Sequence, residues 1–206
     1  GKIEYKFLFY KEKEEIYMIR DIFKLINGIS PDFLLIWNLP FDAAYLIERC
    51  MILGYEPADI MCSNKFNRKE CYLYIDKNTR TFEKKGDFFF ISSETVWMDQ
   101  LINYASLRIS KKKMTSYSLN AVAQLELQDE KLDYSEEANI KVLPYTNYRK
   151  FVKYNIKDVL LQLGIERKNS DIEAIYYSTM SNFTRYSKIF KQSVFLKNRA
   201  YYEFLQ

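Results

Sequence analysis

The chain has 206 residues, of which 48% are hydrophobic, and a formal net charge of +4 at pH 7. It contains no histidine, which excludes Ser-His-Asp and Cys-His nucleophilic catalysis, histidine general bases and the common Cys/His zinc sites. Any catalysis must therefore use carboxylates, tyrosine or lysine. The charge is mild, so it permits nucleic-acid binding without establishing it.

The length suits one domain with a sizeable core, or one domain with an appendage. No apolar run approaches the roughly 20 residues needed to cross a bilayer, and the charged start Gly1–Glu4 is unlike a signal peptide. We therefore predict a soluble, cytoplasmic protein without a membrane partner. The cysteines are odd in number and lack C-x-x-C spacing, which predicts reduced thiols at Cys62 and Cys71, and at Cys50 in the core.

Strand and helix patterns alternate in the first half of the chain, which predicts an α/β fold. The expected elements there are a strand over Lys2–Tyr10, a helix over Glu12–Asn27, a buried strand over Phe33–Trp37, a helix from Asp42 to Gly54, and a meander over Cys71–Ile75, Phe88–Ile91 and Val96–Met98. The second half is mostly helical. Its expected helices cover Leu101–Leu107, Tyr117–Leu127, Tyr148–Ile165 and Ser170–Met180, with a polar loop over Gln128–Thr146.

Two short segments place carboxylates where chemistry is plausible. Asp42 closes the segment Asn38-Leu39-Pro40-Phe41-Asp42 and so lies at a strand-to-helix junction. Tyr154 and Asp158 are four residues apart in a helical pattern, so the phenol and the carboxylate share one helix face.

These two segments resemble the second and third exonuclease motifs of the proofreading domain of family B DNA polymerases. Between them, and in order, lie segments that resemble the family's intervening strand, its S-Y-x-L helix and its lysine motif: Trp97–Leu101, Ser116–Ala123 and Glu130–Tyr134. The resemblance covers about residues 2–168 and is closest to the protein-primed phage and plasmid branch. It implies a ribonuclease H-like fold and removal of nucleotides from the 3′ end of single-stranded DNA.

The resemblance also implies roles for individual residues. Asp42 and Asp158 would hold Mg²⁺ or Mn²⁺ in a two-metal site, Tyr154 would orient the attacking water, and Lys131 would lie close to the phosphate. Taken one at a time, without the resemblance, the residues favour ordinary roles: an N-cap for Asp42, a surface ion pair for Asp158, half-buried packing for Tyr154 and a solvated loop position for Lys131.

Contacts with the terminal nucleotides are implied for two further residues. Asn38 would form hydrogen bonds and Phe41 would stack, although core packing is an open alternative for Phe41. The basic run Lys111-Lys112-Lys113 would either contact DNA phosphate or form a solvated turn.

The family's first motif, D-x-E, supplies two of its four metal-binding carboxylates and is expected to precede Gly1. We therefore predict an N-terminally truncated fragment that is inactive alone. The only Asp-x-Glu, at Asp171 and Glu173, opens a helical pattern after a plausible N-cap, Ser170, and is predicted to be a solvated helix start. Asp99, at the end of a strand, is predicted to be structural.

The resemblance divides the chain into a partial exonuclease domain over residues 1–168 and a helical extension over 169–206 that leads towards a polymerase domain. The polymerase domain of the same polypeptide, phage- or plasmid-encoded, is then the expected partner. Two alternatives stay open: a catalytically silent module that binds single-stranded DNA, and a free-standing exonuclease of the same superfamily. Polymerase motifs downstream would favour the fragment of a polymerase over these two alternatives.

Overall fold

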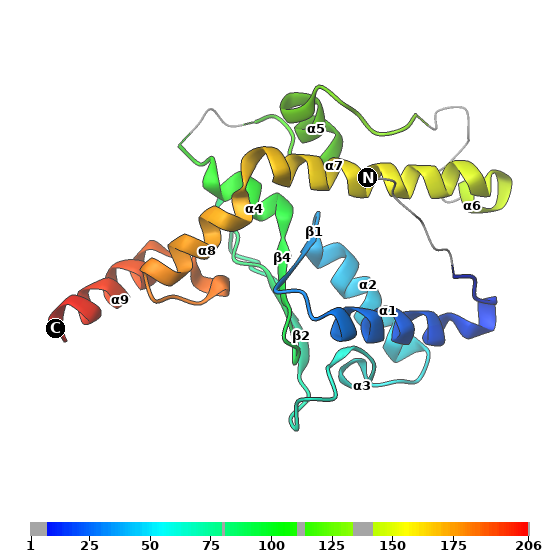
Figure 1. Cartoon of the computed structure of the whole chain (residues 1–206), viewed down its shortest axis with the longest axis horizontal. Helices are drawn as coiled ribbons and strands as arrows, with labels where there is room; N and C mark the ends of the chain where they lie inside the picture. Colours follow the sequence, from blue (N-terminus) through cyan, green and yellow to red (C-terminus); the bar gives the residue numbers. More distant parts are fainter. Residues whose placement is uncertain (1–7, 80, 111–113, 134–141, 206) are drawn as a thin grey trace. The chain divides into compact units, whose positions relative to one another are not determined.

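The computed structural model describes residues 8–79, 81–110, 114–133 and 142–205. The fold is mixed α/β and 59% helical, in agreement with the predicted class. The chain forms two compact units (Figure 1). The N-terminal unit contains the residues up to 75 and residues 87–98, the C-terminal unit contains residues 76–86 and 99–206, and each is described by itself.

The N-terminal unit combines helices with short strands. Its elements are η1 (Glu12–Glu14), α1 (Glu15–Ile29), β1 (Phe33–Ile36), α2 (Leu39–Ile52), α3 (Pro57–Met61), β2 (Cys71–Tyr74), β3 (Phe88–Ile91) and β4 (Val96–Asp99). β1 pairs with β4, and β2 pairs antiparallel with β3. Of the predicted strand Lys2–Tyr10, residues 2–7 lie outside the described part, and residues 8–10 form no strand.

The core of this unit is built on the apolar face of α1. Ile16, Ile19 and Phe23 are buried at helical spacing. Phe23 stacks on Trp97 with ring centroids 5.6 Å apart, and Phe89 meets the same indole edge-on at 5.5 Å. Such aromatic pairs add roughly 0.5–1.5 kcal/mol each beyond the area they bury.

The three cysteines belong to the same unit and are free thiols, as predicted. Cys50 and Cys62 are buried. Burial raises the pKa of all three, and that of Cys71 to about 12. The thiols therefore stay protonated at neutral pH and behave as small core side chains.

The C-terminal unit is helical. Its elements are η2 (Phe82–Lys84), α4 (Gln100–Leu107), α5 (Leu119–Leu127), α6 (Leu143–Thr146), α7 (Tyr148–Asn169), α8 (Asp171–Ser181), η3 (Tyr186–Lys188) and α9 (Gln192–Phe204). α5 packs along α7, where a Cβ on Gly164 would come within 2.8 Å of Leu127 Cδ1. The absence of a side chain at Gly164 therefore permits this close approach.

The helices differ from the predictions at several places. α2 begins at Leu39 rather than Asp42, because Asn38 adopts the left-handed conformation and Pro40 suits the first turn. The predicted loop Gln128–Thr146 contains α6 within its described residues. Ser170 occupies the predicted N-cap position of α8 and also ends α7, but its backbone is left-handed and its side chain makes no cap bond.

The predicted domain boundary at residue 168 stays a prediction. Helix α7 continues through this position and ends at Asn169. Among the described helices, none combines the length and the apolar character that a bilayer crossing needs.

Candidate active-site residues

The start of α2 presents two of the predicted nucleotide-contacting side chains to solvent. The left-handed backbone of Asn38, with φ 67° and ψ 52°, turns the chain sharply out of β1 and into the helix. Asn38 is exposed, and its backbone carbonyl accepts a hydrogen bond from Phe41 N at 3.0 Å. Phe41 is 71% exposed. The core-packing alternative for Phe41 is therefore wrong, and its ring is available for stacking.

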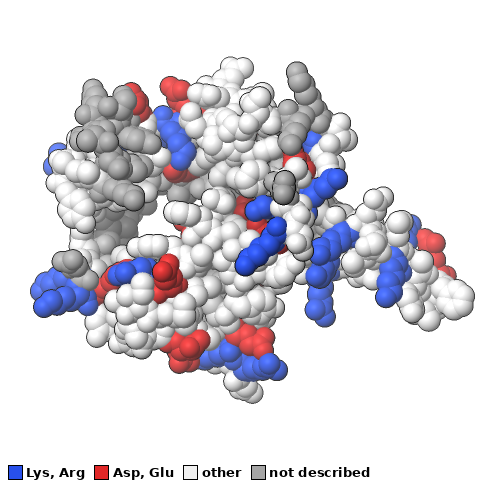
Figure 2. All heavy atoms as spheres, turned by 180° about the vertical axis from the view of Figure 1, so that it is seen from behind, with Lys and Arg blue, Asp and Glu red and all other residues white. Residues whose placement is uncertain are grey.

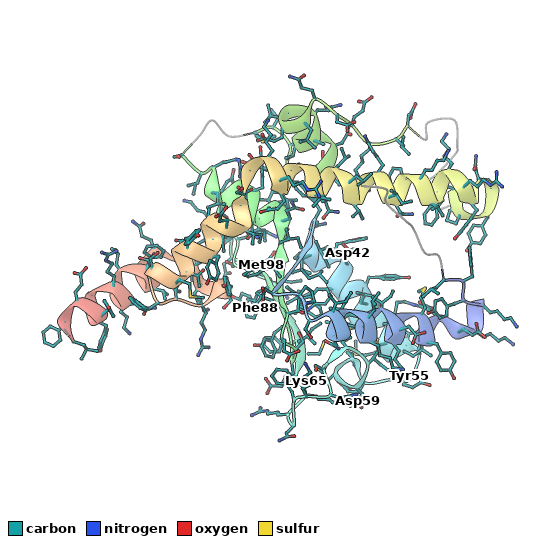
Figure 3. The ribbon with its side chains drawn as sticks, in the orientation of Figure 1. Asp42, Tyr55, Asp59, Lys65, Phe88 and Met98 are labelled. Atoms are coloured by element: carbon teal, nitrogen blue, oxygen red, sulfur yellow. The ribbon has the colours of Figure 1, made fainter. Side chains whose placement is uncertain are left out.

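Asp42 lies in the first turn of α2, as Figure 3 shows, and not at the N-cap. Its side chain is partly buried, and burial raises the pKa of the carboxyl group. Among the described residues, no hydrogen-bond or ion-pair partner offsets this desolvation. Desolvation without a compensating partner favours the neutral, protonated form of this carboxyl group.

Lys131, Tyr154 and Asp158 form one hydrogen-bonded cluster in the C-terminal unit. Lys131 Nζ donates to Asp158 Oδ2 at 2.7 Å and to Tyr154 Oη at 3.2 Å. The ammonium also lies 5.3 Å from the centroid of the Tyr154 ring. Tyr154 and Asp158 therefore share one face of α7, as their spacing predicts, and Lys131 joins them from the segment after α5.

Burial separates this cluster from an ordinary surface ion pair. The side chains of Lys131 and Asp158 are 26% and 22% exposed, and Tyr154 is buried. Asp158 Oδ1 is buried without a hydrogen-bond partner. Asp158 therefore forms an ion pair, as the alternative role held, but the pair is partly buried and Lys131 is not a solvated loop residue. One carboxylate oxygen of Asp158 still lacks a hydrogen-bond donor.

The charge on Lys131 is stabilised within the cluster. Burial alone would lower the pKa of the ammonium, but its bonds to Asp158 and Tyr154 outweigh that effect and raise the pKa. Lys131 thus stays protonated at neutral pH and neutralises Asp158.

Further residues hold this cluster in place, and none of them was predicted from the sequence. Asn120 Oδ1 accepts a hydrogen bond from Lys131 N at 2.8 Å, which ties the loop backbone to α5. Lys157 Nζ donates to both carboxylate oxygens of Asp129, at 2.6 and 2.7 Å. The segment that carries Lys131 is therefore joined to α7 by two ion pairs at consecutive helix positions.

The remaining acidic candidates have structural partners. Asp99 Oδ1 accepts hydrogen bonds from Leu101 N and Ile102 N at 2.9 and 3.2 Å, so it caps α4 as the predicted structural residue. Asp171 does open a helix, but it is 4% exposed and not solvated. Arg108 donates to its two oxygens at 2.9 and 3.0 Å. The prediction of a solvated helix start is thus wrong for Asp171 and right for Glu173, which is exposed.

The Arg108–Asp171 pair belongs to a larger polar network. Tyr104 Oη donates to Glu126 Oε1 at 2.6 Å, and Lys168 lies 3.0 Å from Glu126 Oε2. Burial and the bond to Glu126 raise the pKa of Tyr104. The network joins α4, α5, α7 and α8, and it accounts for the acidic residues of this region without a metal.

Asp42 and Asp158 each carry the carboxylate oxygens that hard cations prefer as ligands. In the part of the chain that the structure describes, no group of three or more Cys, Asp or Glu could hold a metal ion. On the face shown in Figure 2, basic and acidic side chains are interspersed. The run Lys111–Lys113 lies outside the described residues.

No protein-family model matches the chain, and no curated protein gives a significant match to it.

Proposed function

We propose that the chain is part of the 3′–5′ proofreading exonuclease of a family B DNA polymerase, with a ribonuclease H-like fold. The observation that carries the proposal is the Lys131–Tyr154–Asp158 cluster. Lys131 is 23 and 27 residues from its two partners in the sequence, and each of the three belongs to a segment that resembles a family motif. Coincident packing of three unrelated polar residues is a weaker account of a buried, hydrogen-bonded group.

In this proposal the motif residues supply the chemistry. Asp42 and Asp158 would be ligands for Mg²⁺ or Mn²⁺, which when bound would activate water and stabilise charge on the leaving oxygen. Tyr154 orients the attacking water through its hydroxyl, while its buried ring fixes that hydroxyl. Lys131 supplies positive charge near the scissile phosphate.

Substrate contacts come from the start of α2. The exposed ring of Phe41 stacks on a terminal base, and the Asn38 side chain bonds to the same end of the strand. The substrate in this proposal is the 3′ end of single-stranded DNA, and the polymerase domain is the partner within the same polypeptide.

We expect little or no hydrolysis by the chain alone, because it contains two of the four carboxylates on which the family depends. Two cations held close together need enough negative ligands to offset their repulsion. Incubation with 5′-labelled single-stranded DNA and Mg²⁺ or Mn²⁺ measures this. Rapid shortening that Asp42→Ala abolishes would contradict the expectation and would point to another carboxylate.

Iron-directed cleavage tests whether Asp42 and Asp158 each bind metal in a protein that carries the upstream D-x-E motif. Fe²⁺ bound in place of Mg²⁺, with ascorbate and peroxide, cuts the backbone near its ligands. We expect a cut near residue 42 that Asp42→Asn removes and a cut near residue 158 that Asp158→Asn removes, and excess Mg²⁺ should suppress both. No cut at either position would contradict the proposed metal role.

A second candidate is a DNA-binding module that hydrolyses nothing. The exposure of Phe41 and Asn38 favours it, since stacking and hydrogen bonding need no metal. Tight binding to single-stranded DNA in EDTA, with the strand intact after Mg²⁺ is added to a protein carrying the upstream D-x-E motif, would favour this candidate over the exonuclease.

A further inference from the structure

The β2–β3 hairpin divides its side chains between the core and solvent. Successive residues of a strand point to opposite faces. Phe89 and Ile91 are buried in the core of the N-terminal unit, and Cys71 and Leu73 pack against that core. The opposite face carries only aromatic residues: Tyr72, Tyr74, Phe88 and Phe90.

These four rings form a continuous surface. The strand register places Tyr72 opposite Phe90 and Tyr74 opposite Phe88. Both pairs are stacked, with centroids 5.2 Å apart, and Tyr72 also meets Phe88 edge-on at 5.9 Å. Tyr72, Tyr74 and Phe90 are 45%, 43% and 39% exposed. A contiguous exposed aromatic surface of this kind marks an interaction site more often than a scattered set of rings does.

Basic residues lead directly into this surface. The segment 64–70, which precedes β2, contains three cations and one carboxylate, Glu70. Arg68 pairs with Glu70 at 2.6 Å, but its side chain is 88% exposed, so the pair contributes little and a phosphate can replace it. Lys69 Nζ donates to Asn64 Oδ1 at 3.1 Å, and no carboxylate in the described residues pairs with it.

The third cation, Lys65, pairs with Glu94 at 2.9 Å and is 64% exposed. Figure 3 labels Lys65, which belongs to segment 64–70, and Phe88, which belongs to the aromatic surface. Phe66, 39% exposed, lies among the cations. Cations interleaved with exposed rings match a ligand that alternates phosphates with flat bases, and they match an apolar protein surface poorly.

We propose that the aromatic face of the β2–β3 hairpin is a binding platform for single-stranded DNA. Unpaired bases stack on Tyr72, Tyr74, Phe88 and Phe90, and the cations of segment 64–70 contact the phosphates. Exposed aromatic residues on a sheet bind bases in this way because every base has a π-face. The platform uses neither a metal nor Asp42 or Asp158, so it does not depend on the proposed hydrolysis.

Fluorescence anisotropy in EDTA tests the platform, with a 5′-fluorescein oligothymidylate of about 16 nucleotides. Tyr72→Val and Tyr74→Val should each weaken binding about tenfold, since stacking is worth roughly 1–3 kcal/mol per base. Valine favours strands, so the hairpin is retained. Tyr72→Phe, which keeps the ring, should bind like the wild type, and a duplex of the same sequence should bind more weakly.

Two controls separate the platform from general effects. Tyr17→Leu removes a ring on α1 that is 52% exposed and should not change the affinity. Lys69→Gln should lower the slope of log K against log salt by about 0.7, the value for one phosphate on a single strand.

Several outcomes would overturn the platform: no binding by the wild type, wild-type affinity in Tyr72→Val, or an equal loss in Tyr17→Leu. Sedimentation that shows a dimer lost in Tyr72→Val, with DNA binding unchanged, would assign the face to a second copy of the chain instead. Failure of the iron-directed cleavage test would leave the anisotropy result untouched, so the two proposals fail separately.

Discussion

The two predicted metal-binding carboxylates have opposite surroundings. Asp42 is partly buried without a partner among the described residues, and burial raises its pKa. Asp158 is buried to a similar degree but is neutralised by Lys131 at 2.7 Å. The first carboxylate therefore costs the fold free energy and the second contributes to it, although the same kind of motif predicted both. A residue held at an energetic cost is the stronger indication of function.

The largest expected effect is on hydrolysis by the polymerase that we propose contains this chain. Asp158→Ala and Asp42→Ala should each reduce the rate to the background of the assay, because loss of a metal ligand removes both water activation and charge stabilisation. Single-turnover rates at saturating single-stranded DNA measure this. If one variant keeps a substantial rate, the carboxylate that it lacks is not a metal ligand. Asp42 and Asp158 would then have different functions.

Tyr154→Phe should slow the same reaction by about 10²-fold, within the range for a positioning or proton-transferring group. DNA binding should be unchanged, since the buried ring still packs and only the hydroxyl, 3.2 Å from Lys131, is lost. The comparison with Asp158→Ala under identical single-turnover conditions is decisive. Equal rates for Tyr154→Phe and the wild type would make Tyr154 a packing residue.

Local sequence signals predicted most of the helices and strands but not their pairing. The predicted meander is wrong, because β4 pairs with β1 and does not extend the β2–β3 hairpin. Helices α1 and α7 were predicted from the helical spacing of their residues, and β1 to β4 from short apolar runs. Both patterns involve residues that are close together in the sequence. The four-residue spacing of Tyr154 and Asp158 likewise fixes their shared face without tertiary information. The exact helix ends were harder to predict, because they depend on backbone conformations such as the left-handed Asn38 and Ser170. A single sequence gives little indication of these conformations.

Tertiary partners were not predictable from one sequence. Asp171 lies 63 residues from Arg108, and no local pattern distinguishes its buried ion pair from a solvated helix start. Asn120 and Lys157 were missed for the same reason, since their roles depend on the packing of α5 against α7. The aromatic face of the hairpin was not predicted either, because it depends on the strand register that aligns Tyr72 with Phe90.

A smaller effect, on stability, should separate the two carboxylates. Asp158→Ala leaves the Lys131 ammonium partly buried and unpaired, which should lower the free energy of unfolding by about 2 kcal/mol. Asp42→Asn should leave it unchanged or slightly raised, because no partner is lost. Urea unfolding at pH 7 without divalent metal measures both variants. Addition of Lys131→Met to Asp158→Ala should recover most of the loss, and equal destabilisation by the two single variants would contradict the contrast.

The smallest expected effect is a pH dependence at Asp42. Its pKa is raised above the ordinary value of 3.8 by burial, so the folded state holds the proton more tightly than the unfolded state does. The neutral carboxyl therefore contributes stability that is present below the unfolded pKa and lost as the pH rises through the folded pKa. Asparagine stays neutral throughout, so the stability of Asp42→Asn relative to the wild type should increase from about pH 4 towards neutrality and then level off.

Glu48→Gln, an exposed position on the same helix, gives the background for loss of one negative charge. Mg²⁺ should then reduce the difference at neutral pH if it binds the wild-type carboxylate, and a pH-independent difference would mean that Asp42 is as well solvated as a surface residue.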